Sequence, residues 1–437
     1  QTFGTEEFVS LLALVGIVTV IASLISGLIE RTNFPQVAVF LALGAAVGAH
    51  GLGMIDISLD SPALRVVATL SLALVLFTDA LTLNLKEVRQ QSKLTLLILG
   101  PGTLLSAALI ALAAWGLLGL PIAGAIIVGA ALQRRDIPGA ARPALRRESG
   151  LNDVVLLPIV VVAMTFLEAD PATSPDVGGM VLNLFLLGPG AGVAVGLLSV
   201  ATLDMVRRRV GIRRDYESLY SLGVAFAAFA AAEAVHGSGF LAAFAAGLTI
   251  SALDVEMCDC FLEYGETTAE LLLLFTFVLL GSSLIWEGLG IISVASLLFA
   301  ALVLLIRPVA FLFSLARSRL DKRSLAIISW FGPRGLSTLL IVLLPVFEGL
   351  PGSTLLFTIC CLVVLISVVL HGGSMMMLGR GAVRQGAMSA GGTGTVGAVQ
   401  SGVVEGAVHP GGMGAHAPAP VSPPARGTAS SRSSTRT

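Results

Sequence analysis

Long apolar runs separated by short polar segments fill the chain from residue 8 to about residue 378. A helix that crosses roughly 30 Å of hydrocarbon needs roughly 20 apolar residues, and most of the runs approach that length. Barrel strands are not expected, because alternating segments of about 10 residues are absent. The pattern predicts about thirteen helices, at approximately 8–29, 35–53, 65–84, 94–118, 121–133, 149–167, 178–203, 217–235, 239–252, 267–285, 289–314, 324–347 and 353–378.

The pattern changes near residue 381, where the chain becomes rich in Gly, Ala, Ser and Pro and almost free of aromatic residues. Such a segment cannot bury enough apolar surface to fold. We therefore predict a transmembrane domain over residues 1–380 and a disordered cytoplasmic tail over residues 381–437.

Composition supports a membrane protein. The chain is 12% charged and 55% hydrophobic, with a mean hydropathy of +0.93, whereas a soluble domain is about 25% charged. The net charge of −1 gives no basic balance that would suggest nucleic acid as a partner. The four cysteines form neither a disulfide framework nor spaced metal-binding pairs. The predicted fold class is an all-α polytopic membrane protein in contact with the lipid bilayer.

The distribution of charge predicts an orientation. Lys and Arg cluster in five segments, at 86–93, 134–147, 207–214, 317–323 and 380–384. Two other connections, 54–60 and 168–176, are acidic or neutral. Because positive loops remain on the cytoplasmic side, placing the amino end outside puts all five basic clusters inside. We expect a multi-pass protein of the cell (inner) membrane with a cytoplasmic carboxyl tail.

The stretch "RRESGLNDVVLLPIV" places charged residues at the start of an apolar run. Its polar residues are Glu148, Ser149, Asn152 and Asp153. Their spacing of three and four residues puts them on one stripe of a helix. Asp153 would lie about 9 Å beyond Arg147 along the axis, where a carboxylate costs at least a few kcal/mol unless it faces protein or water.

Two interpretations of this stretch remain open. The residues could be interfacial charges at a helix entrance, with Glu148 paired to Arg146 or another neighbour. Alternatively, Asp153 binds either a proton or a small cation, because a hard monovalent cation uses the same oxygen atoms once the proton leaves. Competition for one carboxylate is sufficient to exchange the two ions.

Two other charged residues lie deep in predicted helices. Asp79 in "LVLFTDALTLNL" would lie about 21 Å from Arg65, nearer the inner face, and could be a helix-end charge. Arg307 in "LLIRPVAF" would lie about 15 Å from Arg317. Arg307 could belong to a transport core or could bind carbonyls that Pro308 leaves free.

The stretch "WFGPRGLSTLLIVLLP" predicts an interrupted helix, because Gly332, Pro333 and Gly335 surround Arg334 in an otherwise apolar run. Interrupted helices near the midplane are typical of transporter ion sites, where the ends of the half-helices point their dipoles at the ion.

Four stretches in this order, "RRESGLNDVVLLP", "VHGSGFLAAFAAGL", "WFGPRGLSTLL" and "EGLPG", resemble the monovalent cation:proton antiporter superfamily, in its bacterial sodium/proton exchanger branch. The resemblance covers roughly residues 8–378. It implies a homodimer of thirteen-helix subunits, each with two inverted six-helix repeats, a dimerisation domain and a core domain that moves as an elevator. It also implies exchange of Na⁺, or of K⁺ or Li⁺, for H⁺, without a cofactor and without enzymatic activity.

The resemblance assigns roles to the candidate residues. It implies that Asp153 carries the ion, that Asn152 is its partner, and that Glu148 and Ser149 complete or support the monovalent cation site. Three more residues match family positions in the core, namely Asp79, Arg307 and Arg334. In this family an Asn-Asp pair accompanies electroneutral exchange, since one carboxylate trades one proton for one cation.

One stretch departs from the family pattern. The family has a Thr-Asp motif in an interrupted fifth helix, whereas this chain reads "VGAALQRRDIPGAARPALRRESGLND" and is shorter there. Segment 121–133 spans only about 20 Å as a helix, less than about 30 Å of hydrocarbon. Asp136 is a weak substitute between basic residues. The departure leaves one alternative open, in which the chain is a transport-impaired relative with a structural or regulatory role. A channel is disfavoured, because the sequence contains no recognisable selectivity filter.

Overall fold

The structure is a computed structural model of the whole chain. It describes residues 13, 16–21, 23–24, 36–48, 51–53, 61–83, 102–133, 143–168, 178–179, 182–210, 214–253, 259–315 and 336–371. Within these ranges some helical residues are described by their backbone alone, among them 143–154.

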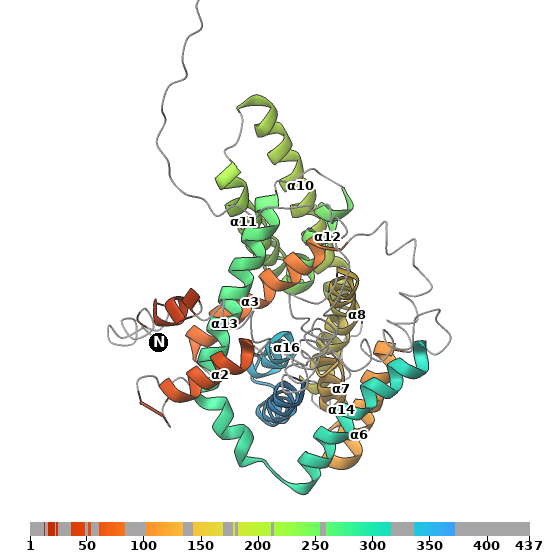
Figure 1. The fold of residues 1–437 in the computed structure, drawn as a ribbon. Helices are drawn as coiled ribbons and strands as arrows, with labels where there is room; N and C mark the ends of the chain where they lie inside the picture. Colours follow the sequence, from red (N-terminus) through yellow and green to blue (C-terminus); the bar gives the residue numbers. More distant parts are fainter. Residues whose placement is uncertain are drawn as a thin grey trace, which may run out of the picture. The chain divides into compact units, whose positions relative to one another are not determined.

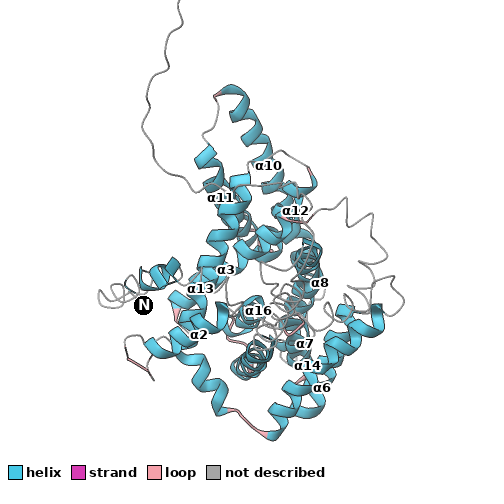
Figure 2. Ribbon diagram, viewed as in Figure 1, coloured by secondary structure: helices cyan, strands magenta, loops and turns pink. Residues whose placement is uncertain are grey.

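The described residues form helices joined by turns and loops, without a β-strand among them (Figure 2). Figure 1 labels the helices α2 (Gln36–Val47), α3 (Pro62–Leu81), α6 (Leu105–Leu118), α7 (Ile122–Ala131), α8 (Pro143–Glu168), α10 (Gly188–Arg209), α11 (Arg214–Ala234), α12 (Gly239–Ala252), α13 (Asp259–Gly290), α14 (Val294–Leu315) and α16 (Leu336–Phe347). The π-helix η2 (Leu182–Leu187), which the figure does not label, directly precedes α10. A further helix, Ser353–His371, follows α16 and is called the last described helix.

Every apolar segment predicted from residue 35 onward overlaps a described helix. The first predicted segment, 8–29, is described at only a few positions, all helical. Two boundaries differ: α8 begins at Pro143 and α13 begins at Asp259, before the apolar runs at 149 and 267. Both helices continue into polar sequence, where hydropathy gives no signal. The all-helical fold class is confirmed, whereas the number of membrane crossings and the inverted repeats remain predictions.

Length and composition of the helices suit a bilayer. Among the described residues, five helices are long and apolar enough to cross a membrane, namely Leu64–Leu81, Leu182–Arg209, Tyr264–Ser282, Val294–Ser314 and Ser353–His371. Helices α6, α10 and α14 leave many large apolar side chains exposed, for example Leu112, Leu198 and Phe313. Contact with lipid explains such surfaces, because hydrocarbon is as apolar as the side chains.

The first helix group consists of α2, α3, α10, α11, α12 and α13, which pack against one another. Small residues bring these helices close. A Cβ atom at Gly247 of α12 would collide with the carbonyl of Phe77 in α3, and one at Gly48 would lie 2.6 Å from Ser282 Cα. The stretch "GSGFLAAFAAGL" therefore packs closely against α3, as is typical of small residues at contacts between membrane helices.

The second helix group consists of α6, α7, α8, α14 and α16. Within it α7 packs against α6, α8 and α16, while α14 packs against α6. A Cβ atom at Gly129 of α7 would lie 2.5 Å from the carbonyl oxygen of Ala107 in α6, so these two backbones almost touch. The two groups meet where α3 packs against α8 and α16, and where α12 packs against α8.

The described residues all lie within one compact unit, Gln1–Arg384. The predicted disordered tail, 381–437, lies outside the described residues. The predicted division of the chain therefore stays a prediction.

Candidate functional site

Helix α8 carries four of the predicted site residues on its backbone. Its bounds, Pro143–Glu168, include Glu148, Ser149, Asn152 and Asp153. Their predicted helical spacing is therefore present, while their side chains lie outside the described part of the chain. The carboxyl-terminal half of α8 buries Leu156, Leu157 and Val160 completely or almost completely. This half anchors the helix in the protein interior.

Four helices pack against α8. Both α7 and α16 pack against α8 and also against each other, and α3 and α12 approach α8 from the first helix group. Figure 1 shows α7, α8 and α16 next to one another near the centre of the view. The helix that carries the predicted ion-binding residues therefore packs against four other helices, and a charged residue within a membrane needs such contacts with protein.

Helix α7 is short, as the sequence predicts. It contains 10 residues, so it is about 15 Å long, half of the hydrocarbon thickness. Leu132 and Gln133 close it, since their amides donate to the carbonyls of Val128 and Ala130 at 3.0 and 3.2 Å. Asp136, the weak substitute for the family's acidic residue, lies outside the described residues.

Helix α16 is the second short helix. It begins at Leu336, directly after the stretch 332–335, and contains 12 residues, about 18 Å. Arg334 and the predicted interruption lie outside the described residues. The described part shows that the apolar helix after this stretch is itself shorter than a full membrane crossing.

The turn after α16 leads directly into the last described helix. Leu350 in this turn donates to the carbonyl of Pro345 at 3.0 Å. Leu356, near the start of that helix, lies close to Gly124 near the start of α7. The amino end of α7 therefore lies near the start of the last described helix.

Two buried polar residues lie at ends of these short helices. Gln133 follows α7 and Thr338 is the third residue of α16; both have 0% relative exposure. Neither the Gln133 amide nor the Thr338 hydroxyl has a hydrogen-bond partner within the described structure. Sequence reasoning missed both residues, although each is a polar side chain in an apolar run.

Asp79 lies near the carboxyl end of α3 and is partly buried. The hydroxyl of Thr82 donates to the backbone carbonyl of Asp79 at 2.9 Å. The hydroxyl of Thr78 donates to the carbonyls of Leu74 and Val75. Its helix contacts α8 and α16. The structure therefore brings the helix of Asp79 to the helices of the predicted site.

Arg307 is 3% exposed in α14, and its guanidinium carbon lies 5.0 Å from the centre of the Phe311 ring. A cation over an aromatic face is attractive, most strongly where water is excluded. Helix α14 continues through Pro308 and packs against α6. Arg307 thus has a stacking contact within its own helix, and its part in ion transport stays a prediction.

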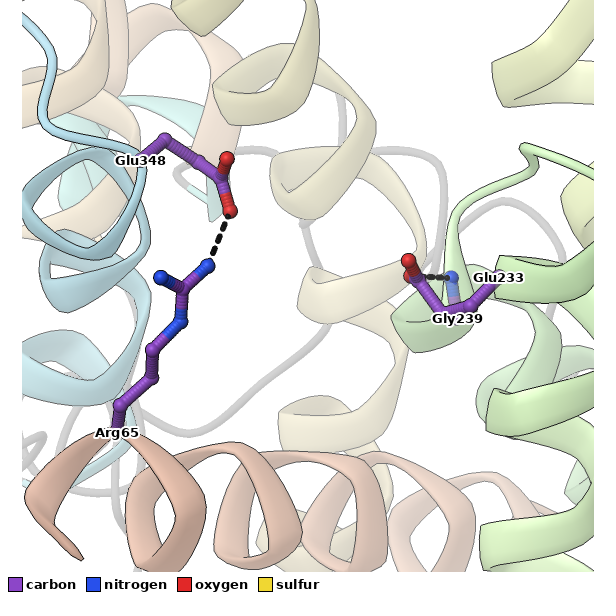
Figure 3. A network of polar contacts seen from close by, with 4 residues as sticks. All are labelled: Arg65, Glu233, Gly239 and Glu348. Carbon is purple, nitrogen blue, oxygen red and sulfur yellow. Dashed lines mark hydrogen bonds and ion pairs between the residues drawn. The ribbon is translucent and has the colours of Figure 1, made fainter. Parts of the chain in front are cut away.

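Two polar contacts tie neighbouring elements together (Figure 3). Arg65 of α3 and Glu348, just after α16, form an ion pair of 3.1 Å. Glu233 near the end of α11 accepts a hydrogen bond of 3.0 Å from the Gly239 amide at the start of α12. The carboxylate of Glu233 therefore caps the amino end of α12, where helix dipoles favour negative charge.

Comparisons with known proteins agree on one family. A family profile described as "Sodium/hydrogen exchanger, transmembrane" matches residues 17–380. The K(+)/H(+) antiporter NhaP of Alkalimonas amylolytica is 24% identical over 83% of this chain, and NhaP2 of Shewanella baltica (strain OS223), also named a K(+)/H(+) antiporter, is 26% identical over 83%. The chain spans 65% of the length of these two relatives.

A solved structure supports the fold. The sodium proton antiporter MjNhaP1 of Methanocaldococcus jannaschii superposes with a TM-score of 0.67 and 19% identity. The match covers 84% of this chain and 100% of that chain. At this identity the similarity establishes a shared arrangement of helices.

Proposed function

The chain belongs to the sodium/hydrogen exchanger family, and from this premise we propose that it is a secondary transporter that exchanges a monovalent cation for protons across the cell membrane. The proposal assigns it to ion antiport and to no enzymatic reaction. The relatives described above are named antiporters. They do not favour the alternative of a transport-impaired relative.

The observation that carries the proposal is the surroundings of α8. The helix bears Glu148, Ser149, Asn152 and Asp153 on its backbone and packs against two helices, α7 and α16, that are each too short to cross the bilayer. Short helix ends within the membrane present backbone carbonyls and amides that stabilise an ion. In this proposal Asp153 binds the proton and the cation alternately, and Asn152, Ser149 and Glu148 support it.

The cation is proposed as Na⁺, K⁺ or Li⁺. The names of the two relatives support K⁺, and the name of the solved structure supports Na⁺. All three ions are hard and take oxygen ligands, which the polar residues of α8 would supply. We further propose electroneutral exchange, because the Asn152–Asp153 pair offers one carboxylate for one proton or one cation.

The two helix groups support a moving core. The second group contains α8 with both short helices, and its main described contacts with the first group are made to α3 and α12. We propose that the second group is the core domain, that it moves against the first group as an elevator, and that the first group forms the interface of a homodimer. Inverted repeats, an external amino end and a cytoplasmic tail belong to the same proposal.

The test is cation-induced proton flux in everted membrane vesicles. The lumen is acidified, Na⁺, K⁺ and Li⁺ are added separately, and the collapse of the pH gradient is followed by fluorescence. Asp153→Asn removes the proposed carrier, and Asp204→Asn is the matched control, since Asp204 is an exposed carboxylate paired with Arg208 at 2.9 Å within α10.

We expect at least one cation to collapse the gradient in the unmodified protein and in Asp204→Asn, and none in Asp153→Asn. A gradient that persists in all three proteins, although all are inserted and folded, would contradict antiport. Equal flux in all three would contradict the assignment of Asp153.

A further inference from the structure

Gln133 and Thr338 present buried polar atoms that need an explanation. Both side chains are fully buried, and their amide and hydroxyl groups form no hydrogen bond within the described part of the chain. Burying such groups without a partner costs free energy, and a native structure that contains them usually places a water molecule or an ion there. The two groups are therefore candidates for ligand contacts.

Other buried hydroxyls of the chain show the contrast. Thr358 donates to the carbonyl of Thr354 at 2.7 Å, and Ser106 donates to the carbonyl of Gly102 at 2.6 Å, each about one turn earlier in the same helix. Thr338 is only the third residue of α16. Among the described residues no carbonyl lies one turn before it in that helix, and its hydroxyl forms no hydrogen bond there.

The carboxyl end of α7 favours a cation. The last carbonyls of an α-helix have no partner within the helix, and they form the negative end of its dipole. Gln133 directly follows this end of α7, and Thr338 lies in the first turn of α16, a helix that packs against both α7 and α8. Oxygen atoms of carbonyl, amide and hydroxyl groups are the ligands that replace water around alkali cations.

We propose that Gln133 and Thr338 supply neutral oxygen ligands to the monovalent cation carried at α8, and that they set its affinity and the preference among Na⁺, K⁺ and Li⁺. The inference rests on the proposed function, and it names residues of α7 and α16 that complete the site. It also accounts for a chain that lacks the Thr-Asp motif, because neutral oxygens at the end of α7 take the place of that motif. The carrier carboxylate remains Asp153.

The test compares isosteric substitutions in the purified protein. Gln133→Leu and Thr338→Val remove the polar atoms at nearly constant volume, and Thr338→Ser keeps the hydroxyl. Thr358→Val is the matched control, since it removes a buried hydroxyl that already has its partner. Thermal unfolding is measured while NaCl, KCl or LiCl replaces choline chloride at constant ionic strength, and the apparent KM for each cation is measured in vesicles.

A ligand that binds the folded state raises the melting temperature as its concentration exceeds the Kd. We expect a saturable, cation-specific rise in the unmodified protein, in Thr338→Ser and in Thr358→Val. In Gln133→Leu and Thr338→Val we expect the rise to require about tenfold more cation, together with an about tenfold higher apparent KM, because a lost contact to an ion weakens binding by that order. The ratio of KM values for Na⁺ and K⁺ should change as well.

A structural role would give another result. If the two residues only pack, removing their unsatisfied atoms should raise the melting temperature in choline and leave both the cation response and KM unchanged. That result would overturn the inference.

The test also separates this inference from the proposed function. If the unmodified protein moves no protons but still shows a cation-specific rise that both variants weaken, the site stands and the proposed exchange fails. If the unmodified protein exchanges ions and the variants match it, exchange stands and the inference fails. If the unmodified protein shows neither flux nor a cation-specific rise, both fail.

Discussion

Arg65 and Glu348 join the two helix groups by an ion pair of 3.1 Å (Figure 3). Arg65 lies near the start of α3, and Glu348 follows the last residue of α16. The guanidinium also lies 6.0 Å from the centre of the Phe347 ring. Both charged side chains are more than half exposed, so the pair contributes at most about 1 kcal/mol to stability. Its position between the groups gives it more importance for motion than for stability.

Breaking this pair should change the rate of exchange more than it changes stability. If the second helix group moves against the first, the pair holds one of the end states and must open in each cycle. Glu348→Gln should therefore raise the maximal exchange rate up to about fivefold, which corresponds to about 1 kcal/mol. Stopped-flow measurement of the proton flux in vesicles, together with a melting curve, tests both effects.

The matched control for this variant is Asp204→Asn, which breaks an exposed ion pair within the single helix α10. The charge reversal Arg65→Glu with Glu348→Arg should return the rate to that of the unmodified protein. An unchanged rate in Glu348→Gln would show that the pair does not limit the motion.

The contact of Arg307 with Phe311 should contribute to stability. Phe311 is fully buried, and its ring lies 5.0 Å from the guanidinium carbon. Phe311→Leu should lower the free energy of unfolding by about 1–3 kcal/mol, through lost packing and the lost cation–π contact. Phe313→Leu is the control on the same helix, because Phe313 is 76% exposed. Equal melting temperatures of the two variants would contradict this interpretation.

Much of the fold could be predicted from the sequence because apolar runs and basic clusters mark the helices directly. The short α7 was predictable for the same reason, since basic residues follow its apolar run and limit its length. The starts of α8 and α13 were not, because both helices begin in polar sequence where hydropathy carries no signal.

The candidate site could be predicted in part. The polar stripe of α8 was visible from its spacing, while the importance of Gln133 and Thr338 was not. A lone threonine in an apolar run looks the same whether it bonds to its own helix, as Thr358 does, or remains without a partner, as Thr338 does within the described residues. The difference depends on helix ends and on packing among α7, α8 and α16. The pair of Arg65 and Glu348 joins residues 283 positions apart, a distance at which local pattern carries no information.

Because α12 packs closely against α3, replacing glycine by alanine should have opposite effects on stability at Gly247 and at Gly223. In Gly247→Ala the new Cβ atom would collide with the Phe77 carbonyl, which should destabilise the protein by about 1–3 kcal/mol. In Gly223→Ala of α11 the new Cβ atom meets no atom within 4 Å among those described. There the smaller entropy of the unfolded chain should stabilise by about 0.4–1 kcal/mol. Melting curves in detergent should therefore shift in opposite directions, and a shared direction would contradict the described packing.

Exchange at a single carboxylate should be independent of membrane potential. In the proposed cycle Asp153 carries either one proton or one cation, so the loaded site has the same charge in both directions of transport and the potential does no net work. A second carrier carboxylate would change this balance, because a moved elementary charge is worth about 2.3 kcal/mol per 100 mV. The measurement is Na⁺-driven proton flux in proteoliposomes at zero potential and at an imposed inside-negative potential, with Asp153→Asn as the baseline. We expect equal initial rates at both potentials.

Rates that rise or fall with the potential would show that net charge crosses the membrane, and they would require a second ionisable carrier, for which Glu148 on the same helix is the first candidate.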